Sequence, residues 1–456
     1  MEGAEAAALA AALEAAAGTS AGNGRGRGIA LAYNSNLDLV VDAGRVFGPG
    51  GPAGEPAACD GFGGEAACEV LATPADVLCC FRLFAADGRA AERMVVDDEL
   101  YAALVAHAAA ADASVEHVGG NAALMAVAAA GFAPEARILL GGPVGPGLAA
   151  LLPGSVELAA GAPEAADEVH LIIEYKAGVE VAGVVPPRAN RFILHCDKVN
   201  GELRGAKTFH VALGDFAPDT VVLSGFHLLD ALAVEASTPR VSAVVAELAA
   251  AVGGLKYRPS VHLELASMAN SAYMAQLVEL TAGAVDSIGF NEQELEGLVA
   301  ALGLDGTKPL FAADATSHNV PSRAGVESAL ASLFQHLDSS ASTVTRLHFH
   351  SLAYHVVCTR GSSWGEPAGP AAAGALAVGF RACGLAPQPV SSFNPAIHFD
   401  VLYTTGNDGG VETFTLDPQT QCALAPVLVC KAPVRTVGLG DSISAAGLLA
   451  FQYQAK

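Results

Sequence analysis

Residues 436–448 read Thr-Val-Gly-Leu-Gly-Asp-Ser-Ile-Ser-Ala-Ala-Gly-Leu, so the turn Gly438-Leu439-Gly440-Asp441 leads directly into an apolar, helix-forming segment. Two glycines let backbone N–H groups converge at a helix N-terminus, where an anion such as phosphate binds well. A carboxylate in the same turn would repel a phosphate. Its presence there therefore indicates that it has a chemical role. That role would be to accept the proton of a hydroxyl that attacks phosphorus. In the alternative interpretation, Asp441 is an ordinary N-cap residue in a Gly-rich connection.

A strand, a glycine-rich or polar turn and a helix follow one another repeatedly along the chain. Helical patterns cover residues 74–86, 97–111 and 122–130. Strand-like apolar runs cover residues 28–34, 136–140, 220–225, 260–265, 287–291 and 346–350. This alternation is typical of a doubly wound α/β domain with a mostly parallel sheet flanked by helices.

Other segments alternate polar and apolar residues, as strands of a half-exposed sheet do. They are residues 39–46, 168–180, 191–196 and 207–211. We therefore expect a smaller α+β lid domain, formed by residues 39–111 and 168–211. The large α/β nucleotide-binding domain would comprise residues 28–38, 112–167 and 212–456. Residues 1–27 would form a flexible N-terminal segment, because the Ala-rich start runs into a Gly/Arg linker.

The formal net charge of −23 argues against nucleic acid and anionic membranes as partners, because only 24 Lys and Arg residues are spread over 456 positions. A phosphate-bearing ligand would have to be held by backbone amides, a metal ion and a few cations. The chain shows no signal or transit pattern and no apolar run long enough to span a membrane. We therefore predict a cytoplasmic protein, and we expect it to be a monomer.

The nine cysteines include no Cys-x-x-Cys pair, so neither a zinc site nor a compact disulfide framework is predicted. Reduced thiols in a cytosol-like compartment are the favoured interpretation. A disulfide between Cys59 and Cys68, which lie in a Gly/Pro-rich stretch, is the alternative.

Two carboxylates follow predicted strands of the α/β domain, Glu264 in His262-Leu-Glu264 and Glu294 in Asn291-Glu-Gln-Glu294. Ligands of open parallel sheets bind at the carboxyl ends of the strands. If the two strands are neighbours, the carboxylates converge, and a divalent cation such as Mg²⁺ would relieve their repulsion near a phosphate. In the alternative interpretation, Asn291 and Glu294 form a helix capping box, which does not exclude metal binding.

Amides and isolated carboxylates gather near other predicted strand ends. Asn36 and Asp38 follow the first strand, Gly120-Asn121 opens a helix, and Glu92 lies in the proposed lid. A neutral polyol suits such a set, because each hydroxyl can donate to a carboxylate and accept from an amide. Considered singly, Asn36 and Asp38 are also common turn residues.

Eight short motifs now occur in order over nearly the whole chain. They are Asn36-Leu-Asp38, Gly88-Arg-Ala-Ala-Glu92, Gly119-Gly-Asn-Ala122, Asn190-Arg-Phe-Ile193, His262-Leu-Glu264, Asn291-Glu-Gln-Glu294, Arg346-Leu-His-Phe-His350 and Gly438-Leu-Gly-Asp441. Together they resemble the ADP-dependent glucokinases, which are ribokinase-like enzymes, and most of all the eukaryotic branch. Asn-x-x-Glu and Gly-x-Gly-Asp recur throughout the ribokinase-like enzymes. His-x-Glu with Arg-x-His-x-His is specific to the ADP-dependent group.

The resemblance implies a function and roles for single residues. It implies transfer of the β-phosphoryl group of ADP to the 6-hydroxyl of glucose, with Asp441 as the base and the turn Gly438 to Asp441 stabilising the transferred group. Glu264, Glu294 and Asp441 would hold Mg²⁺, and Arg191 would reach the transferred phosphate. The glucose contacts would be Asn36, Asp38, Glu92, Gly120 and Asn121.

Two alternatives remain at this point. The acceptor could be fructose 6-phosphate, as in the related phosphofructokinases, although Glu92 would repel a sugar phosphate. The chain could also be a sugar- or nucleotide-binding regulator without catalysis, although Asp441, Glu264 and Glu294 together argue against it. The choice of ADP over ATP rests on the resemblance alone.

Overall fold

The computed structural model describes most of the 456-residue chain. The described residues are 2–18, 27–48, 51–52, 59, 62–68, 70–111, 114–230, 234–266, 268, 270–304, 308–311, 320–386, 388–406, 410–434 and 437–451. Thr436 of the opening stretch and most of the predicted linker lie outside these residues. Among the helices described, none is long and apolar enough to cross a bilayer.

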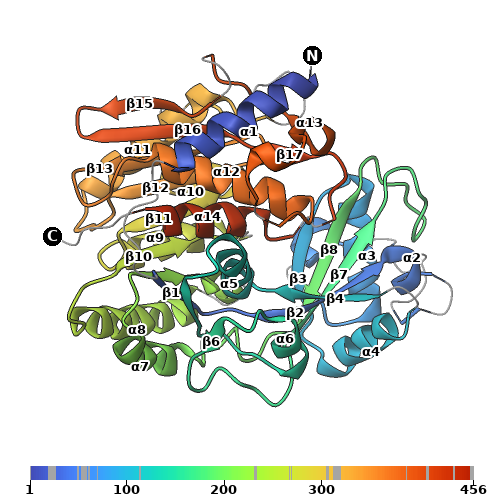
Figure 1. Cartoon of the computed structure of the whole chain (residues 1–456). Coiled ribbons are helices and arrows are strands. Elements are labelled where there is room, and N and C mark those ends of the chain that lie inside the picture. Colours follow the sequence, from blue (N-terminus) through green and yellow to red (C-terminus); the bar gives the residue numbers. More distant parts are fainter. Residues whose placement is uncertain are drawn as a thin grey trace.

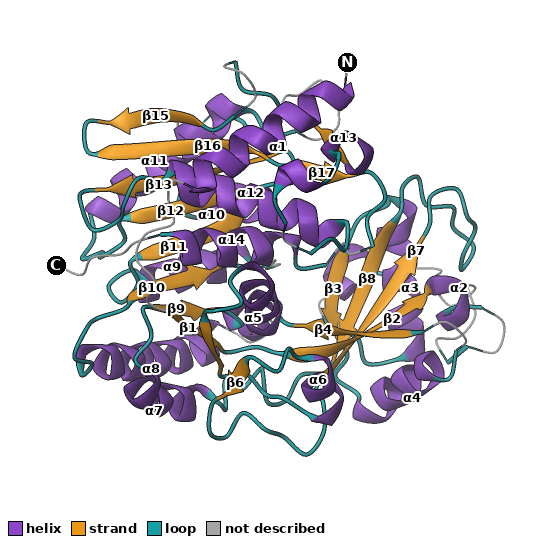
Figure 2. Cartoon of the chain, viewed as in Figure 1, coloured by secondary structure: helices purple, strands orange, loops and turns teal. Residues whose placement is uncertain are grey.

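A ten-stranded sheet dominates the molecule, with helices on its two faces (Figure 2). Seven neighbouring strands from β6 to β12 are parallel, and the last three are antiparallel. In spatial order the strands are β15 (Glu412–Asp417), β16 (Thr420–Pro426), β13 (Tyr354–Arg360), β12 (Arg346–His350), β11 (Ser287–Asn291), β10 (Ser260–Glu264), β9 (Thr220–Leu223), β1 (Gly28–Ala32), β5 (Arg137–Leu140) and β6 (Val156–Leu158).

The two faces of this sheet are buried by different helices, which explains why its strands are almost continuously apolar. On β1, Ile29 and Leu31 pack in one cluster with residues of α5 and α14, whereas Ala30 and Ala32 pack in another with residues of α7 and α8. The helices of this domain are α5 (Asn121–Phe132), α6 (Pro146–Leu151), α7 (Ala206–Phe216), α8 (Val234–Gly253), α9 (Ser271–Thr281), α10 (Glu292–Ala301), α11 (Arg323–Asp338), α12 (Ala368–Ala382), α13 (Pro395–His398) and α14 (Leu439–Ala450), with the 3₁₀ turns η3 (Phe226–Leu229) and η4 (Val390–Ser392).

A second, five-stranded sheet lies beside the first (Figure 1). Its strands in order are β3 (Ala91–Met94), β8 (Asn190–His195), β7 (Val169–Tyr175), β2 (Asn36–Asp42) and β4 (Val115–Gly119). It belongs to a smaller domain with its own apolar cluster. The helices there are α2 (Ala43–Val46), η2 (Gly64–Cys68), α3 (Pro74–Ala86) and α4 (Asp98–Ala109). The predicted fold class, α/β with a smaller α+β domain, is confirmed.

The sheets do not divide the chain at the expected positions. β2 already begins at Asn36 and β4 spans Val115–Gly119, so residues 36–38 and 115–119 belong to the smaller sheet rather than the larger. Helix α7 begins at Ala206 and packs against β1 and α8 of the large domain, although residues up to 211 were assigned to the lid. A segment that passes from one sheet to the other has residues typical of both sheets. The sequence therefore does not show at which residue one domain ends and the other begins.

Two strand predictions differ from the structure, and one pair of strands was not predicted. Residues 207–211 are helical in α7, because Phe209 and Leu213 form one buried stripe at helical spacing. The strand predicted over residues 39–46 ends at Asp42, whose side chain caps α2 through the N–H of Gly44. The apolar run 426–430 contains β17 (Leu428–Cys430), which pairs with β14 (Phe399–Val401) in a separate two-stranded sheet.

The N-terminal segment is also not the flexible tail that we predicted. Residues Glu2–Gly18 form helix α1, which lies across α12 and α13 (Figure 1). Ala6, Leu9, Ala10 and Leu13 are buried in a cluster with residues of α12 and β16. One apolar position per turn suffices for this packing, because alanine side chains let two helices approach closely. In an Ala-rich sequence, the stripe formed by these positions does not stand out from the other residues.

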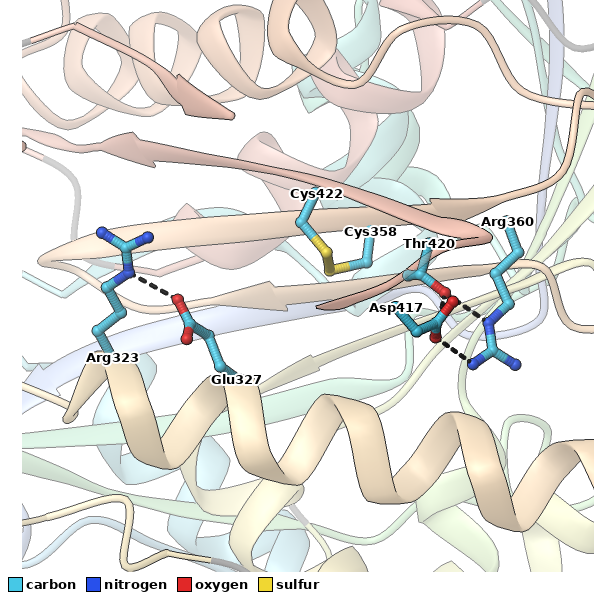
Figure 3. The surroundings of a disulfide bond; sticks show 7 residues. All are labelled: Arg323, Glu327, Cys358, Arg360, Asp417, Thr420 and Cys422. Atoms are coloured by element: carbon cyan, nitrogen blue, oxygen red, sulfur yellow. Dashed lines mark hydrogen bonds and ion pairs between the residues drawn. A yellow bond between two sulfur atoms is a disulfide. The ribbon is translucent and has the colours of Figure 1, made fainter. Parts of the chain in front are cut away.

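The expectation of reduced thiols is wrong for the structure, which pairs eight of the nine cysteines. The pairs are Cys59–Cys79, Cys68–Cys80, Cys358–Cys422 and Cys383–Cys430, so Cys59 and Cys68 do not pair with each other. Cys358 and Cys422 face each other on the antiparallel strands β13 and β16 (Figure 3). Such partners come together only through the fold, so the spacing of the cysteines does not reveal them.

Charged pairs flank that disulfide on the same side of the sheet. Arg360 on β13 bonds Asp417 at 2.9 Å, and Asp417 in turn accepts a hydrogen bond from Thr420 at 2.7 Å (Figure 3). At the other side of the disulfide in this view, Arg323 and Glu327 pair one turn apart on α11 (Figure 3). Arg323 also bonds Glu412 of β15 at 2.8 Å, and this contact fastens the antiparallel edge of the sheet to α11.

Candidate active site

A cavity of about 400 Å³ lies where the two domains meet, at the carboxyl ends of the parallel strands. Its size is within the range of small-molecule sites. It unites nearly all the site residues predicted from the sequence. They are Asp38, Glu92, Gly120, Asn121, Arg191, Glu264, Glu294, Gly438, Gly440 and Asp441.

Asn36 is the exception among the predicted residues, because it does not line this cavity. Its side-chain N–H donates to Asp38 Oδ1 at 2.7 Å, so it holds Asp38 in place. The cavity wall is instead formed by Asn34, in the turn between β1 and β2. Asn34 Oδ1 accepts a hydrogen bond from the hydroxyl of Ser224 at 2.9 Å. This contact joins the end of β1 to the end of β9.

The turn Gly438 to Asp441 opens helix α14. Gly438 is the N-cap residue, in the left-handed region at φ 70°, and no side chain caps the helix. Asp441 therefore lies inside the first turn, and the interpretation of Asp441 as an N-cap is wrong. Gly440 contacts the ring of His350 so closely that a Cβ at this position would lie 2.7 Å from Cε1. Only glycine fits there.

Two helix N-termini point into the cavity. Helix α5 starts at Asn121 after Gly120, whose φ of 77° also requires glycine. The side-chain amide of Asn121 donates to Asp441 Oδ1 at 3.0 Å and so links the starts of α5 and α14. The free N–H groups and the positive dipole ends of both helices favour an anion between them.

The pKa of Asp441 is unusually high for an aspartate. Burial raises the pKa of Asp441, the charge of Glu264 raises it further, and the hydrogen bond from Asn121 only partly opposes them, leaving the pKa at about 7. A carboxylate with a pKa near neutrality is a far better proton acceptor than an ordinary surface aspartate. The position of the group and its basicity thus both suit general-base catalysis.

Glu264 is held by three donors at the end of β10. His262 contacts Oε2 at 2.7 Å, while His350 and Ser444 donate to Oε1 at 2.9 and 3.0 Å. Burial alone would raise the pKa of Glu264, but these hydrogen bonds and the charges of both histidines lower it to about 2. Glu264 is therefore a fixed, permanent negative charge.

Glu294 occupies the first turn of α10 and forms the capping box that we expected as one interpretation. Asn291 accepts a hydrogen bond from the backbone N–H of Glu294, and Glu294 Oε2 accepts one from the backbone N–H of Asn291 at 2.8 Å. Burial raises the pKa of Glu294 to about 7. A nearby cation would therefore be needed to keep this side chain fully ionised at neutral pH.

The three carboxylates do not converge on one point. Among the residues described, the only group of three or more ligand side chains with atoms within 4.8 Å of one another is His170, His195 and Asp197, in the smaller domain. Glu264 also accepts three hydrogen bonds from protein donors, and Glu294 accepts two. They fit Mg²⁺ through its water molecules, since this ion keeps several waters when it binds proteins.

The smaller domain supplies two further carboxylates that line the cavity, Asp38 and Glu92. Burial raises the pKa of Asp38 to about 6, although the charge of His170 opposes the shift. Burial also raises the pKa of Glu92, but the surrounding histidine charges outweigh it and leave the pKa below its usual value. Arg191 on β8 is the cation of this wall, and it also borders a neighbouring cavity of about 620 Å³.

Comparison with known proteins identifies the family of this chain. The conserved region of ADP-specific phosphofructokinases and glucokinases matches residues 27–450. The chain belongs to this family of kinases. It is 36% identical over 382 residues to an ADP-dependent glucokinase of Bos taurus, covering 80% of this chain and 74% of the relative. It is 32% identical to a protein of Caenorhabditis elegans named "Probable ADP-dependent glucokinase", covering 93% and 85%.

Solved structures share the fold at low sequence identity. An ADP-dependent kinase in complex with fructose 6-phosphate and ADPβS superposes with a TM-score of 0.69 at 18% identity, covering 96% of each chain. A phosphofructokinase from Pyrococcus horikoshii OT3 with AMP gives a TM-score of 0.62 at 19% identity, covering 93% of this chain and 97% of that one. The two-domain fold therefore extends over essentially the whole chain.

Sequence reasoning missed several cavity residues, His170 and His227 among them. His350, which the sequence analysis named only as the end of a motif, bonds Glu264. A histidine on a buried strand has no local signature that separates a core position from a site. The partners of these histidines are distant in sequence, so only the fold identifies them.

The close contact at Gly440 predicts that alanine substitutions at two glycines of α14 have very different effects on activity. Gly440→Ala should lower phosphoryl transfer by ~10² or more, because the methyl group displaces His350 and with it Glu264, part of a site that stabilises developing charge. Gly447→Ala is the matched control, since its nearest atom outside α14 would lie 3.5 Å away. Steady-state turnover checks this, and equal activity of the two variants would contradict it.

Proposed function

We propose that this protein phosphorylates the 6-hydroxyl of D-glucose with ADP as the donor, giving glucose 6-phosphate and AMP. The observation that carries the proposal is the contact between Asn121 and Asp441. It places a buried carboxylate with a raised pKa at the start of one helix, beside the start of another, in a cavity whose far wall holds Glu92 and Asp38. The names of the relatives favour glucose as the acceptor.

In the proposed reaction, Asp441 accepts the proton of the 6-hydroxyl as that oxygen attacks the β-phosphorus of ADP, and AMP leaves. The N–H groups of Gly438 to Asp441 stabilise the negative charge that spreads over the transferred group. Arg191 reaches the same group from the smaller domain. Closure of that domain over the sugar excludes water, which limits hydrolysis of ADP.

Mg²⁺ is the proposed metal. When bound, it neutralises charge on the phosphates of ADP. Glu264 and Glu294 would hold it, and the fixed charge of Glu264 would supply the main electrostatic attraction. Asp441 lines the same cavity and is the third residue proposed near the metal, with its Oδ1 accepting a hydrogen bond from Asn121.

The acceptor end of the cavity favours a neutral sugar over a sugar phosphate. Glu92 has a lowered pKa and stays ionised, and Asp38 adds a second carboxylate. Asn36, Asp38, Glu92, Gly120 and Asn121 are the proposed glucose-binding residues, with Asn36 acting by orienting Asp38. Fructose 6-phosphate would bring its own phosphate near these negative charges and be repelled.

An assay of donors and acceptors tests the whole proposal. Purified protein with Mg²⁺ should form glucose 6-phosphate from ADP and glucose, with much slower reaction of fructose 6-phosphate. Formation of AMP and sugar phosphate is followed by coupled enzymes and by chromatography. Turnover with ATP but not with ADP would refute the donor, and preference for fructose 6-phosphate would refute the acceptor.

Replacement of the proposed base separates chemistry from binding. Asp441→Ala should lower kcat by at least ~10² while the Kd for glucose changes little, because a general base contributes to the reaction barrier rather than to ground-state binding. Asp215→Asn, at an exposed position of α7, is the matched control. Near-normal turnover of the Asp441 variant, measured alongside isothermal titration with glucose, would show that another group accepts the proton.

The raised pKa of Asp441 predicts how the rate depends on pH. Because the base must be deprotonated, kcat/KM should fall about tenfold per pH unit below a pH near 7. Asn121→Ala removes the hydrogen bond that lowers this pKa, so its acidic limb should move to higher pH. A profile that is flat down to pH 5, or a limb that does not move in the variant, would argue against Asp441 as the titrating group.

The location of the protein and its oligomeric state are also proposals, and they do not depend on the geometry of the cavity. Four disulfides are typical of oxidising compartments and rare in the cytosol. The sequence-based proposal of a cytoplasmic location therefore competes with an oxidising compartment, and the alkylation state of the thiols in cell extracts distinguishes the two. A monomer is proposed, which light scattering of the purified protein can check.

A further inference from the structure

Arg346, the first residue of β12, is a charged side chain with no access to solvent. Its guanidinium lies over the rings of Phe451 and Trp364, with Cζ 4.9 and 5.6 Å from their centroids. Its hydrogen bonds go to Ser287 and His348 rather than to a carboxylate. Burying a charge is costly unless it is paired and hydrogen-bonded. The groups that Arg346 bonds therefore indicate what it does there.

The register of the parallel strands places three polar side chains in one row. Ser287, at the start of β11, lies directly opposite Arg346 on one neighbouring strand and His262 of β10 on the other. All three are fully buried. Residues two apart on a strand share a face of the sheet, so Glu264 lies on the same face as His262.

A continuous chain of hydrogen bonds runs along this row to Glu264. Arg346 Nη1 donates to the hydroxyl oxygen of Ser287 at 2.8 Å. Ser287 Oγ lies 2.8 Å from Nδ1 of His262, and His262 Nε2 lies 2.7 Å from Glu264 Oε2. The row thus connects a buried cation to the buried carboxylate that is proposed to hold the metal.

The direction of each hydrogen bond in this chain follows from the chemistry of the side chains. A guanidinium can only donate, so Ser287 accepts from Arg346. The single hydroxyl proton of Ser287 is then donated to Nδ1 of His262. If Nδ1 carried a proton instead, the buried hydroxyl would lose its acceptor, which is costly. At neutral pH the ring therefore carries its proton on Nε2 and donates it to Glu264.

Gly289, in the middle strand, leaves the space that this arrangement needs. It lies directly opposite Glu264 on β10 and His348 on β12. A Cβ at this position would collide with Oε2 of Glu264 and lie 3.0 Å from Nε2 of His262. The histidine and the carboxylate at the end of the chain therefore meet over a backbone without a side chain.

The charge of Arg346 also acts on Glu264 directly. Burial lowers the pKa of Arg346 to about 9 and the charge of Glu264 opposes this shift, so the guanidinium stays charged at neutral pH. The cation in turn offsets part of the cost of burying Glu264. Because His350 and Ser444 bond the other oxygen of this carboxylate, both of its oxygens are held.

We propose that Arg346 is a positioning residue for Glu264. Acting through Ser287 and His262, it fixes the hydrogen bond to Glu264 Oε2 and so keeps the carboxylate in the orientation that binds a divalent cation. This inference rests on the proposed function, because it takes Glu264 to hold the metal. Loss of a partner that orients a metal ligand typically weakens metal binding 10-fold to 100-fold. Ser287 and Arg346 lie one and two steps beyond His262, so we expect the lower end of this range.

The first experiment measures the binding of Mn²⁺ alone, from the electron paramagnetic resonance signal of the free ion. Ser287→Ala breaks the chain by removing one oxygen atom and should raise the Kd for Mn²⁺ about 10-fold. Ser260→Ala is the matched control and should bind Mn²⁺ like the wild-type protein. Ser260 is also a fully buried serine at the start of a strand of this sheet, but it bonds Thr220. Equal Kd values for the two variants, or a wild-type protein that binds no Mn²⁺, would overturn the proposal.

The second experiment replaces the cation and separates the hydrogen-bonded chain from a simple effect of charge. A cation that acted only through space would repel Mn²⁺, so Arg346→Met would bind the ion more tightly. The proposed chain predicts the opposite, a Kd raised about 10-fold. In Ser287→Ala the chain is already broken, so adding Arg346→Met should raise the Kd little further. Tighter binding by Arg346→Met, or fully additive effects, would contradict the proposal. If Arg346→Met does not fold, the first experiment decides alone.

A third measurement detects the proton on His262 in the metal-free protein. Nitrogen NMR of the protein labelled at histidine, assigned with His262→Gln, should show Nε2 protonated and Nδ1 unprotonated at neutral pH. A proton on Nδ1 would overturn the proposal. That result would leave the proposed function intact, since it concerns only how Glu264 is held. Absence of glucose phosphorylation by the wild-type protein with ADP and Mg²⁺ would refute the function instead.

Discussion

The burial of three carboxylates around one small cavity is the constraint on which the rest of this structure depends. Glu264, Glu294 and Asp441 repel one another in a medium that screens charge poorly, so each requires its own compensation. Glu264 receives two histidines and a serine, Glu294 a helix N-terminus, and Asp441 an amide from a second helix. The uncompensated part of this repulsion and burial leaves two of the carboxyl groups, Glu294 and Asp441, with pKa values of about 7, which suits Asp441 to its proposed role as a base.

Much of the fold and many of the site residues could be predicted from the sequence, for a physical reason. A parallel sheet buried on both faces forces continuous apolar strands, so β1, β10, β11 and β12 were located closely. Turns that require glycine, such as Gly120 and Gly438, mark where helices begin. The site could then be inferred, because polar residues that follow such strands meet at one edge of the sheet.

What escaped prediction depends on contacts between distant segments. The bond from Ser224 to Asn34, the anchoring of His170 by Asp197 and the four disulfides all join residues that nothing local connects. The sequence analysis predicted a strand where helix α7 lies, because its short alternation of polar and apolar residues fits the spacing of a strand as well as that of a helix. Only the buried face of α7 in the structure decides between the two. Residues 36–38 were placed in the wrong domain because strand β2 begins immediately after the turn that leaves β1.

The docking of α1 has a practical meaning for anyone who handles this protein. Helix α1 packs on α12, and α12 packs on α14, the helix that carries Asp441 in its first turn (Figure 1). Helix α1 is thus separated from the proposed catalytic carboxylate only by α12 and α14. A fusion partner at α1, or its removal, would disturb the packing of α12, which supports α14. Affinity tags are therefore better placed elsewhere on the surface.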